Sequence, residues 1–179
     1  MLKIVIPGME LFDERTQEFI YTEEIALVLE HSLVSISKWE SFWNKPFLGR
    51  EEKTSEQVID YIRCMTVTEN VEYEVYSRLT ELHLNQISDY INAPMTATTF
   101  NDLGSKPSRE IITSEIIYYW MVSYNIPFEC QYWHLNRLMA LIKVCNVKNN
   151  PPKKMSKQEI MERNKRLNAE RRAKLKSKG

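Results

Sequence analysis

The chain has 179 residues, enough for one well-buried domain, and its 24 basic and 24 acidic residues leave no net charge. A hydrophobic content of 43% with only 4 glycines excludes a disordered or fibrous chain. No stretch approaches the roughly 18 consecutive apolar residues of a membrane span, and the first residues lack the pattern of a signal peptide. We therefore expect a cytoplasmic protein that can later enter an assembly.

The neutral total hides a separation of charge along the chain. Residues 151–179 contain eleven Lys or Arg and three Glu, a balance of +8, so residues 1–150 carry a balance of −8. An acidic body joined to a basic end favours contacts between oppositely charged protein surfaces.

The N-terminal part of the chain has the pattern of β-strands. The run LKIVI (2–6) is rich in β-branched residues and stops at Pro7-Gly8. EFIYTEE (18–24) and the alternating run 25–31 are two further strand candidates. These patterns predict a small β-sheet within residues 1–34.

The next segment changes to a helical period. SISKWESFW (35–43) places Trp39 and Trp43 four residues apart, on one face of a helix. Large aromatic residues at this spacing fit either a hydrophobic core or an exposed anchor for a partner. The pattern leaves both alternatives open.

Two further helical regions follow. In TSEQVIDYIRCM (54–65), Thr54 is followed three residues later by Gln57, which is the pattern of a reciprocal helix cap. Residues 71–91 have apolar residues at helical spacing and predict one helix or two.

The central part of the chain combines β-type and strongly helical sequence. TATTF (96–100) is β-rich, and REIIT (109–113) is a candidate return strand. SEIIYYWMVSY (114–124) is apolar on nearly every side, which predicts a central core helix. Residues 127–145 predict one long helix with Pro127 as its first residue.

The last segment predicts a separate basic helix over about residues 157–175. Ser156 and Glu159 form a capping pattern, and Met155 and Ile160 flank them as a hydrophobic staple. The apolar positions of this helix are few, so its own contacts hold it weakly and a second surface is needed to stabilise it.

These elements together predict a mostly α (α+β) fold, with a small N-terminal sheet, a helical domain and a basic C-terminal helix. The predicted boundaries are 1–34 for the β region, 35–147 for the helical core, 148–155 for a linker and 156–179 for the basic end.

No pattern of residues points to catalysis. The chain lacks a Gly-x-Ser-x-Gly motif and a Gly-rich phosphate loop, and its three cysteines and three histidines are scattered rather than set at metal-ligand spacing. We expect no enzyme, no cofactor and no metal site.

The residues expected to bind a partner are instead the two tryptophans and the arginines of the basic end. Three interpretations of that end compete: a solvated tail, a nucleic-acid-binding arm and a helix that docks on an acidic protein surface. It has the charge for phosphate contacts but no aromatic residue for base stacking. Protein docking is the favoured interpretation, and the candidate residues are Trp39, Trp43, Arg163, Arg166, Arg171 and Arg172.

Several segments in order resemble a protein family of tailed phages and prophages of Gram-positive bacteria. They are SLVSISKWESFWNKPFL (32–48), MTATTF (95–100), REIITSEIIYYWM (109–121), NIPFECQYWHLNRLMALIKVCN (125–146) and PPKKMSKQEIMERNKRLNAERR (151–172). The resemblance implies a product of the tail-morphogenesis gene region. Its best functional label is a tail assembly chaperone, which binds the tape measure protein or tail-tube subunits in the host cytoplasm.

Two alternatives remain open beside the chaperone. One is a structural or connector protein of the finished virion, from the same gene region. The other is a nucleic-acid-binding protein that acts through its basic end, which we rank below protein docking. A second copy of the chain is a further partner that the opposite charges of body and end allow, and no membrane contact is expected.

Overall fold

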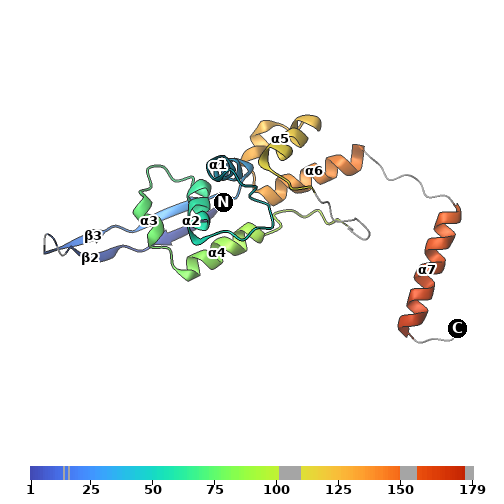
Figure 1. The fold of residues 1–179 in the computed structure, drawn as a ribbon, viewed down its shortest axis with the longest axis horizontal. Coiled ribbons are helices and arrows are strands. Elements are labelled where there is room, and N and C mark those ends of the chain that lie inside the picture. The colour runs from blue at the N-terminus through green and yellow to red at the C-terminus, as the bar shows by residue number, and fades with distance from the viewer. Residues whose placement is uncertain (14, 16, 101–109, 150–156, 176–179) are drawn as a thin grey trace. The chain divides into compact units, whose positions relative to one another are not determined.

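The computed structural model describes residues 1–13, 15, 17–100, 110–149 and 157–175. It consists of two compact units, Met1–Cys145 and Asn146–Gly179. The first unit has a small β region followed by helices, and the second contains a long helix (Figure 1). The predicted mostly α (α+β) class is confirmed.

Four short strands form the β region as two antiparallel pairs. Strand β1 (Leu2–Ile6) pairs with β4 (Ile25–Leu29), and β2 (Met9–Asp13) pairs with β3 (Glu18–Thr22). The three predicted strands are confirmed, whereas β2 was not predicted. We call the hairpin of β2 and β3 the arm; it projects from the helices in Figure 1.

One face of the β1–β4 pair packs against the hydrophobic core. Ile4, Ile6, Leu27 and Leu29 alternate with exposed or half-buried neighbours and are at most 3% exposed. This alternation follows from the two-residue period of a strand. Helix α4 contacts β1 and adds to the cover of the pair.

Four helices follow the sheet: α1 (Leu33–Trp43), α2 (Ser55–Met65), α3 (Tyr73–Ser77) and α4 (Glu81–Asn92). The helices predicted over 35–43 and 54–65 are confirmed, and the region 71–91 contains two helices. The reciprocal cap at the start of α2 is also confirmed. Thr54 Oγ1 accepts from the Gln57 amide, and Gln57 Oε1 accepts from the Thr54 amide.

The structure from residue 96 onward differs from the expectation in three ways. Residues 96–100 and 110–113 form no strand. Helix α5 (Ser114–Ser123) buries only one face, because Ile117 and Met121 are buried while Tyr119 is 68% exposed. It is therefore not the central core helix that its composition predicts.

The predicted helix over 127–145 is also divided. A short 3-10 helix η1 (Phe128–Tyr132) precedes α6 (Leu135–Asn149), and His134 between them forms a β-bridge with Ser32. The amide of Leu135 donates to the carbonyl of His31. These contacts fix the chain in an extended conformation at the point where a single helix would continue.

The core of the first unit is built from β1, β4 and the helices, without the arm. Helix α1 lies at its centre and contacts α2, α5 and η1. Among the described residues, the hydrophobic ones that are at most 1% exposed are Ile6, Leu27, Leu29, Leu33, Ile36, Met65, Ile117, Met121 and Leu138.

The second unit contains α7 (Lys157–Leu175), which confirms the helix predicted over 157–175. The described side chains of α7 are exposed, except that of Leu167, which is half-buried. The predicted cap at Ser156 and the staple at Met155 lie outside the described residues, as does the side chain of Glu159.

Candidate partner-binding surfaces

The arm exposes a pair of aromatic side chains. Phe12 and Phe19 lie opposite each other in the register of β2 and β3, with ring centroids 5.1 Å apart. They are 53% and 58% exposed, and Tyr21 on the same face of the hairpin is 72% exposed. The Tyr21 hydroxyl donates to Glu10 Oε1 across 2.7 Å, and this bond raises the pKa of Tyr21. Contiguous exposed aromatic groups are typical of protein-binding surfaces.

The arm is joined to the helices at its base through Arg78. Its Nη1 donates to Thr22 Oγ1 at 2.9 Å, to Pro7 O at 3.2 Å and to Glu23 O at 3.3 Å. Gly8 allows the two strands to approach at the same point, since a Cβ there would lie 2.4 Å from Thr22 O. These contacts therefore fix the base of the arm to the end of α3.

The sequence offered a partial indication of the arm that the strand prediction did not use. In MELFD (9–13), three apolar residues stand among two acidic ones, but Leu11 and Phe12 are adjacent and break the strict alternation of a strand, so the signal is weak. The sequence between the two strands, ERTQ (14–17), contains no glycine, so it does not show a Gly-based hairpin turn. The positive φ of 55° is instead adopted by Gln17.

Trp39 lies in the core, and its position corrects its inclusion among the partner-binding residues. Its side chain is 2% exposed, and its Nε1 donates to the Gln57 carbonyl across 2.9 Å. The ring also lies against Phe47, with centroids 5.2 Å apart. A side chain so enclosed leaves a partner no surface to contact.

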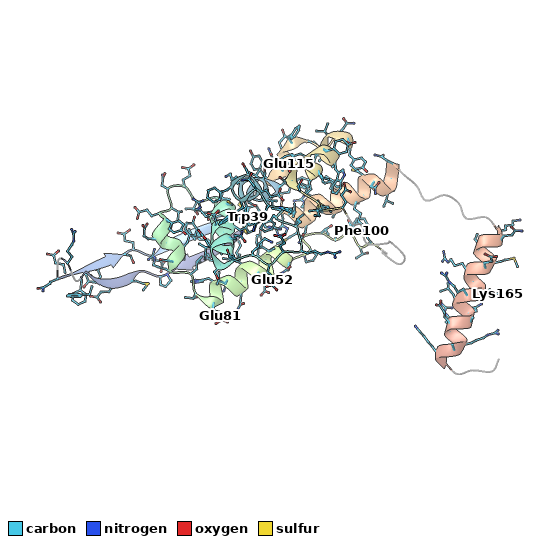
Figure 2. The ribbon with its side chains drawn as sticks, in the orientation of Figure 1. Trp39, Glu52, Glu81, Phe100, Glu115 and Lys165 are labelled. Carbon is cyan, nitrogen blue, oxygen red and sulfur yellow. The ribbon has the colours of Figure 1, made fainter. Side chains whose placement is uncertain are left out.

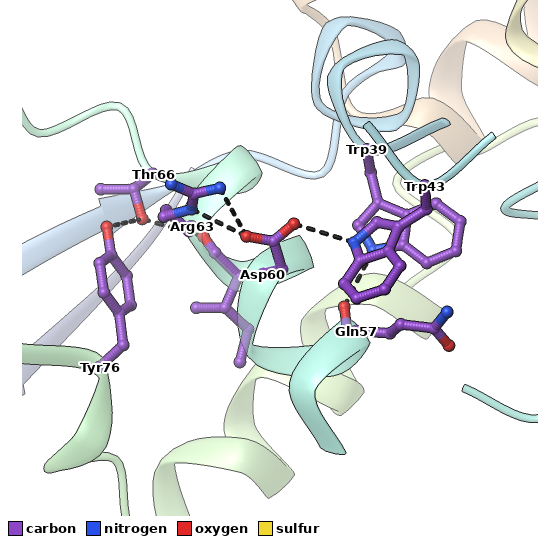
Figure 3. A network of polar contacts seen from close by, with 8 residues as sticks. Trp39, Trp43, Gln57, Asp60, Arg63, Thr66 and Tyr76 are labelled. Atoms are coloured by element: carbon purple, nitrogen blue, oxygen red, sulfur yellow. Dashed lines mark hydrogen bonds and ion pairs between the residues drawn. The ribbon is translucent and has the colours of Figure 1, made fainter. Parts of the chain in front are cut away.

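Trp43 belongs to a polar network at the edge of the core (Figure 3). Its Nε1 donates to Asp60 Oδ2 across 2.9 Å, and Arg63 forms an ion pair of 2.6 Å with the other oxygen of that carboxylate. The ring of Trp43 is half-buried. Its polar atom already has a partner within the chain, and a contact with another protein through its exposed edge stays a prediction.

A cluster of polar side chains lies inside the first unit, between α1, α2 and α6. The Tyr61 hydroxyl is hydrogen-bonded to His31 Nδ1, and the rings of His31 and His134 pack edge to face with centroids 5.1 Å apart. Burial, and then the charge of His134, lowers the pKa of His31 to about 4. Burial also lowers the pKa of His134 and raises that of Tyr61.

The same cluster extends to Glu30. The Tyr90 hydroxyl donates to Glu30 Oε1 across 2.7 Å, and His134 Nε2 lies 3.0 Å from the Tyr90 carbonyl oxygen. Burial is the main cause of the raised pKa of Tyr90. These groups satisfy one another inside the core and hold α4 and α6 to the end of β4, which is a structural arrangement.

The basic candidates of α7 share one helix but occupy different faces of it. Figure 2 shows Lys165 with the other side chains along α7. Arg166 Nε lies 3.9 Å from Glu170 Oε1, one turn further along the helix. Arg171 and Arg172 are exposed side chains that point in different directions, because successive residues are about 100° apart around a helix.

Among the described residues, no group of His, Cys, Asp and Glu is placed to hold a metal ion, and no helix combines the length and apolar character of a membrane span. Comparisons with protein-family models, curated proteins and solved structures find no match to the chain.

Proposed function

We propose that this protein is a tail assembly chaperone of a tailed phage or prophage, and that the arm binds an apolar segment of its client. The client is the tape measure protein or a tail-tube subunit, as the sequence resemblance implies. The observation that supports the proposal is the Phe12–Phe19 pair, because each ring is more than half exposed on a projecting hairpin.

A rigid aromatic pair suits this task for a physical reason. Aromatic side chains bury a large apolar area and lose little conformational entropy when they bind, which makes them frequent interface hot spots. A long helical client offers apolar side chains at regular spacing. The arm offers them two adjacent rings, tilted 58° to each other, on a hairpin whose base is fixed by Arg78.

Co-expression with the tape measure protein of the same phage tests the proposal. The full chain is expected to keep the tape measure protein in the soluble fraction and to form a complex with it on gel filtration. The variant Phe12→Ser/Phe19→Ser is expected to lose both effects. The variant Phe42→Ser is the matched control, because Phe42 is a 64% exposed aromatic residue on α1, outside the arm.

Three outcomes would overturn the proposal. One is an unchanged complex in Phe12→Ser/Phe19→Ser. Another is the chain at structural copy number in purified virions, which indicates the structural or connector alternative. The third is salt-sensitive retention on DNA that requires residues 151–179, without a complex with either tail protein, which indicates nucleic-acid binding.

A further inference from the structure

A groove of about 760 Å³ lies where the arm meets α3. Its apolar lining comes from both sides: Met9 belongs to the arm, and Val75 and Leu79 belong to α3 and the residues after it. The side chain of Met9 is 44% exposed, whereas that of Tyr21 points to the opposite face of the arm, because Met9 pairs with Thr22 and Tyr21 pairs with Glu10. Met9 and the half-buried Leu79 therefore give the groove an apolar floor beside the buried Val75.

The rim of this groove is acidic. Glu23, Glu72 and Glu74 line it with exposed side chains, and none of these carboxylates forms an ion pair with another described residue. The one basic residue of the lining, Arg78, already donates to three oxygen atoms at the base of the arm, those of Pro7, Thr22 and Glu23. An apolar floor with acidic rims fits a helix that carries apolar and basic residues on one face.

The chain itself contains such a helix. At 100° per residue, Ile160 and Leu167 of α7 lie on the same side of the helix, and Arg171 and Lys174 lie within about 40° of them. Ile160 is 44% exposed. Lys165 and Arg172 lie on the other side, more than about 100° from Ile160. The side with Ile160 and Leu167 thus carries the apolar and basic groups that match the groove.

We propose that the groove binds this face of α7 from a second copy of the chain. The arrangement within the first unit favours a neighbouring copy, because the arm and α3, which line the groove, lie toward one end of the unit and α6, after which the chain continues to α7, lies toward the other (Figure 1). The groove and α7 are different surfaces, so the contact is head to tail and leaves each bound copy with one surface free. This self-association does not depend on the chaperone activity.

Sedimentation velocity of the full chain at several protein and salt concentrations tests this contact. The wild type is expected to associate more at higher protein concentration, with a dissociation constant that rises about tenfold or more between 0.05 M and 0.5 M salt, because salt screens exposed charges. A groove variant, Glu72→Gln/Glu74→Gln, and a tail variant, Arg171→Gln/Lys174→Gln, are each expected to remain monomeric.

An equimolar mixture of these two variants gives the decisive measurement. The intact α7 of the groove variant is expected to bind the intact groove of the tail variant, and the resulting pair has no matching surface left. A 1:1 complex that grows no further supports the proposal. The control Lys165→Gln/Arg172→Gln removes the same charge from the other side of α7 and is expected to associate as the wild type does.

A wild type that stays monomeric under all conditions overturns the proposal. So does a mixture that forms no pair. If α7 instead bound the groove of its own chain, the wild type would stay monomeric. Equal loss of association in the control variant also overturns it, because the contact would then depend on total charge. None of these results affects the client assay with Phe12→Ser/Phe19→Ser.

Discussion

Arg78 Nη1 donates to Thr22 Oγ1 across 2.9 Å, and this bond joins the C-terminal end of α3 to strand β3. The same nitrogen reaches the carbonyl of Pro7, on the other side of the hairpin. A two-stranded hairpin is marginally stable alone. The position of the arm therefore depends on a guanidinium from outside the sheet.

Replacing Arg78 by Met is expected to loosen the arm without unfolding the core. A charged hydrogen bond contributes about 1.5–3 kcal/mol at a buried site and less at this half-buried one. Losing these bonds is expected to make hydrogen exchange in β2 and β3 roughly tenfold faster. Exchange measured by mass spectrometry checks this. Arg50→Met, at an exposed position, is the control. Equal exchange of the arm in the two variants would contradict the prediction.

Replacing Trp39 by Ala is expected to lower the free energy of unfolding by about 3–5 kcal/mol, because it leaves a cavity in the core and removes the donor to the Gln57 carbonyl. Phe42→Ala, on the exposed side of the same helix, is expected to change it by less than about 0.5–1 kcal/mol. Urea denaturation followed by circular dichroism distinguishes the two. Similar values for both variants would show that Trp39 is not enclosed.

Glu40 is expected to be the most sensitive acidic residue of the chain. Its buried carboxylate accepts from the Phe47 amide and from the Ser114 amide, both at 2.7 Å, and so caps α5 from α1. Glu40→Ala leaves both amides unpaired and is expected to lower the free energy of unfolding by about 3 kcal/mol or more. Glu40→Gln retains an acceptor and is expected to lose less.

The control for this series is Glu56→Ala, which removes an exposed carboxylate from the first turn of α2. It is expected to lower the free energy of unfolding by about 1 kcal/mol or less. Thermal and urea denaturation of the three variants provide the comparison, and equal losses in Glu40→Ala and Glu56→Ala would refute the capping role.

The buried His31 is expected to make stability depend on pH in the acid range. Its pKa is about 4 in the folded chain and near 6.5 in the unfolded chain, because burial and the neighbouring His134 disfavour the imidazolium. Above pH 6.5, His31 is neutral in both states. As the pH falls from 6.5 to 4, only the unfolded state takes up the proton, so the free energy of unfolding falls, by on the order of 3 kcal/mol in total.

Urea denaturation between pH 4 and pH 8 measures this loss. The Tyr61 hydroxyl and the rings of His134 and Phe47 lie around the imidazole, and no hydrogen bond or ion pair joins it to a carboxylate of the described residues. Because His134 shifts in the same direction, its protonation adds to the loss. His31→Gln is expected to flatten the profile, and a variant with the wild-type slope would rule out His31 as the cause.

Local sequence was sufficient where the structure depends on nearby residues. The start of α2 follows from Thr54 and Gln57, which bond to each other within one turn. The extent of α7 likewise agrees with its helical composition. In these segments, hydrogen bonds between neighbouring residues determine where the helix begins and which residues it contains.

Distant contacts explain where sequence reasoning failed. The expected helix over 127–145 is interrupted because His134 pairs with Ser32, about a hundred positions earlier. The burial of Trp39 depends on a carbonyl group of α2, and the start of α5 depends on Glu40. The hydrophobic periodicity of a segment does not show which distant residue it will contact. The pattern around Trp39 and Trp43 therefore could not show which tryptophan is buried and which is partly exposed.

The contact between Glu40 and Ser114 joins two residues that the ribosome adds at different times, so the earlier one lacks its partner during synthesis. The chain is made from its N-terminus, so the sheet and α1 exist before the residues that enclose them. Leu33 and Ile36 become buried only when the later helices pack on α1. The His31 carbonyl accepts its hydrogen bond only after Leu135 has been synthesised. A nascent chain that stops before α6 would therefore expose α1, and a ribosome pause at that point would extend its exposure to cellular proteases.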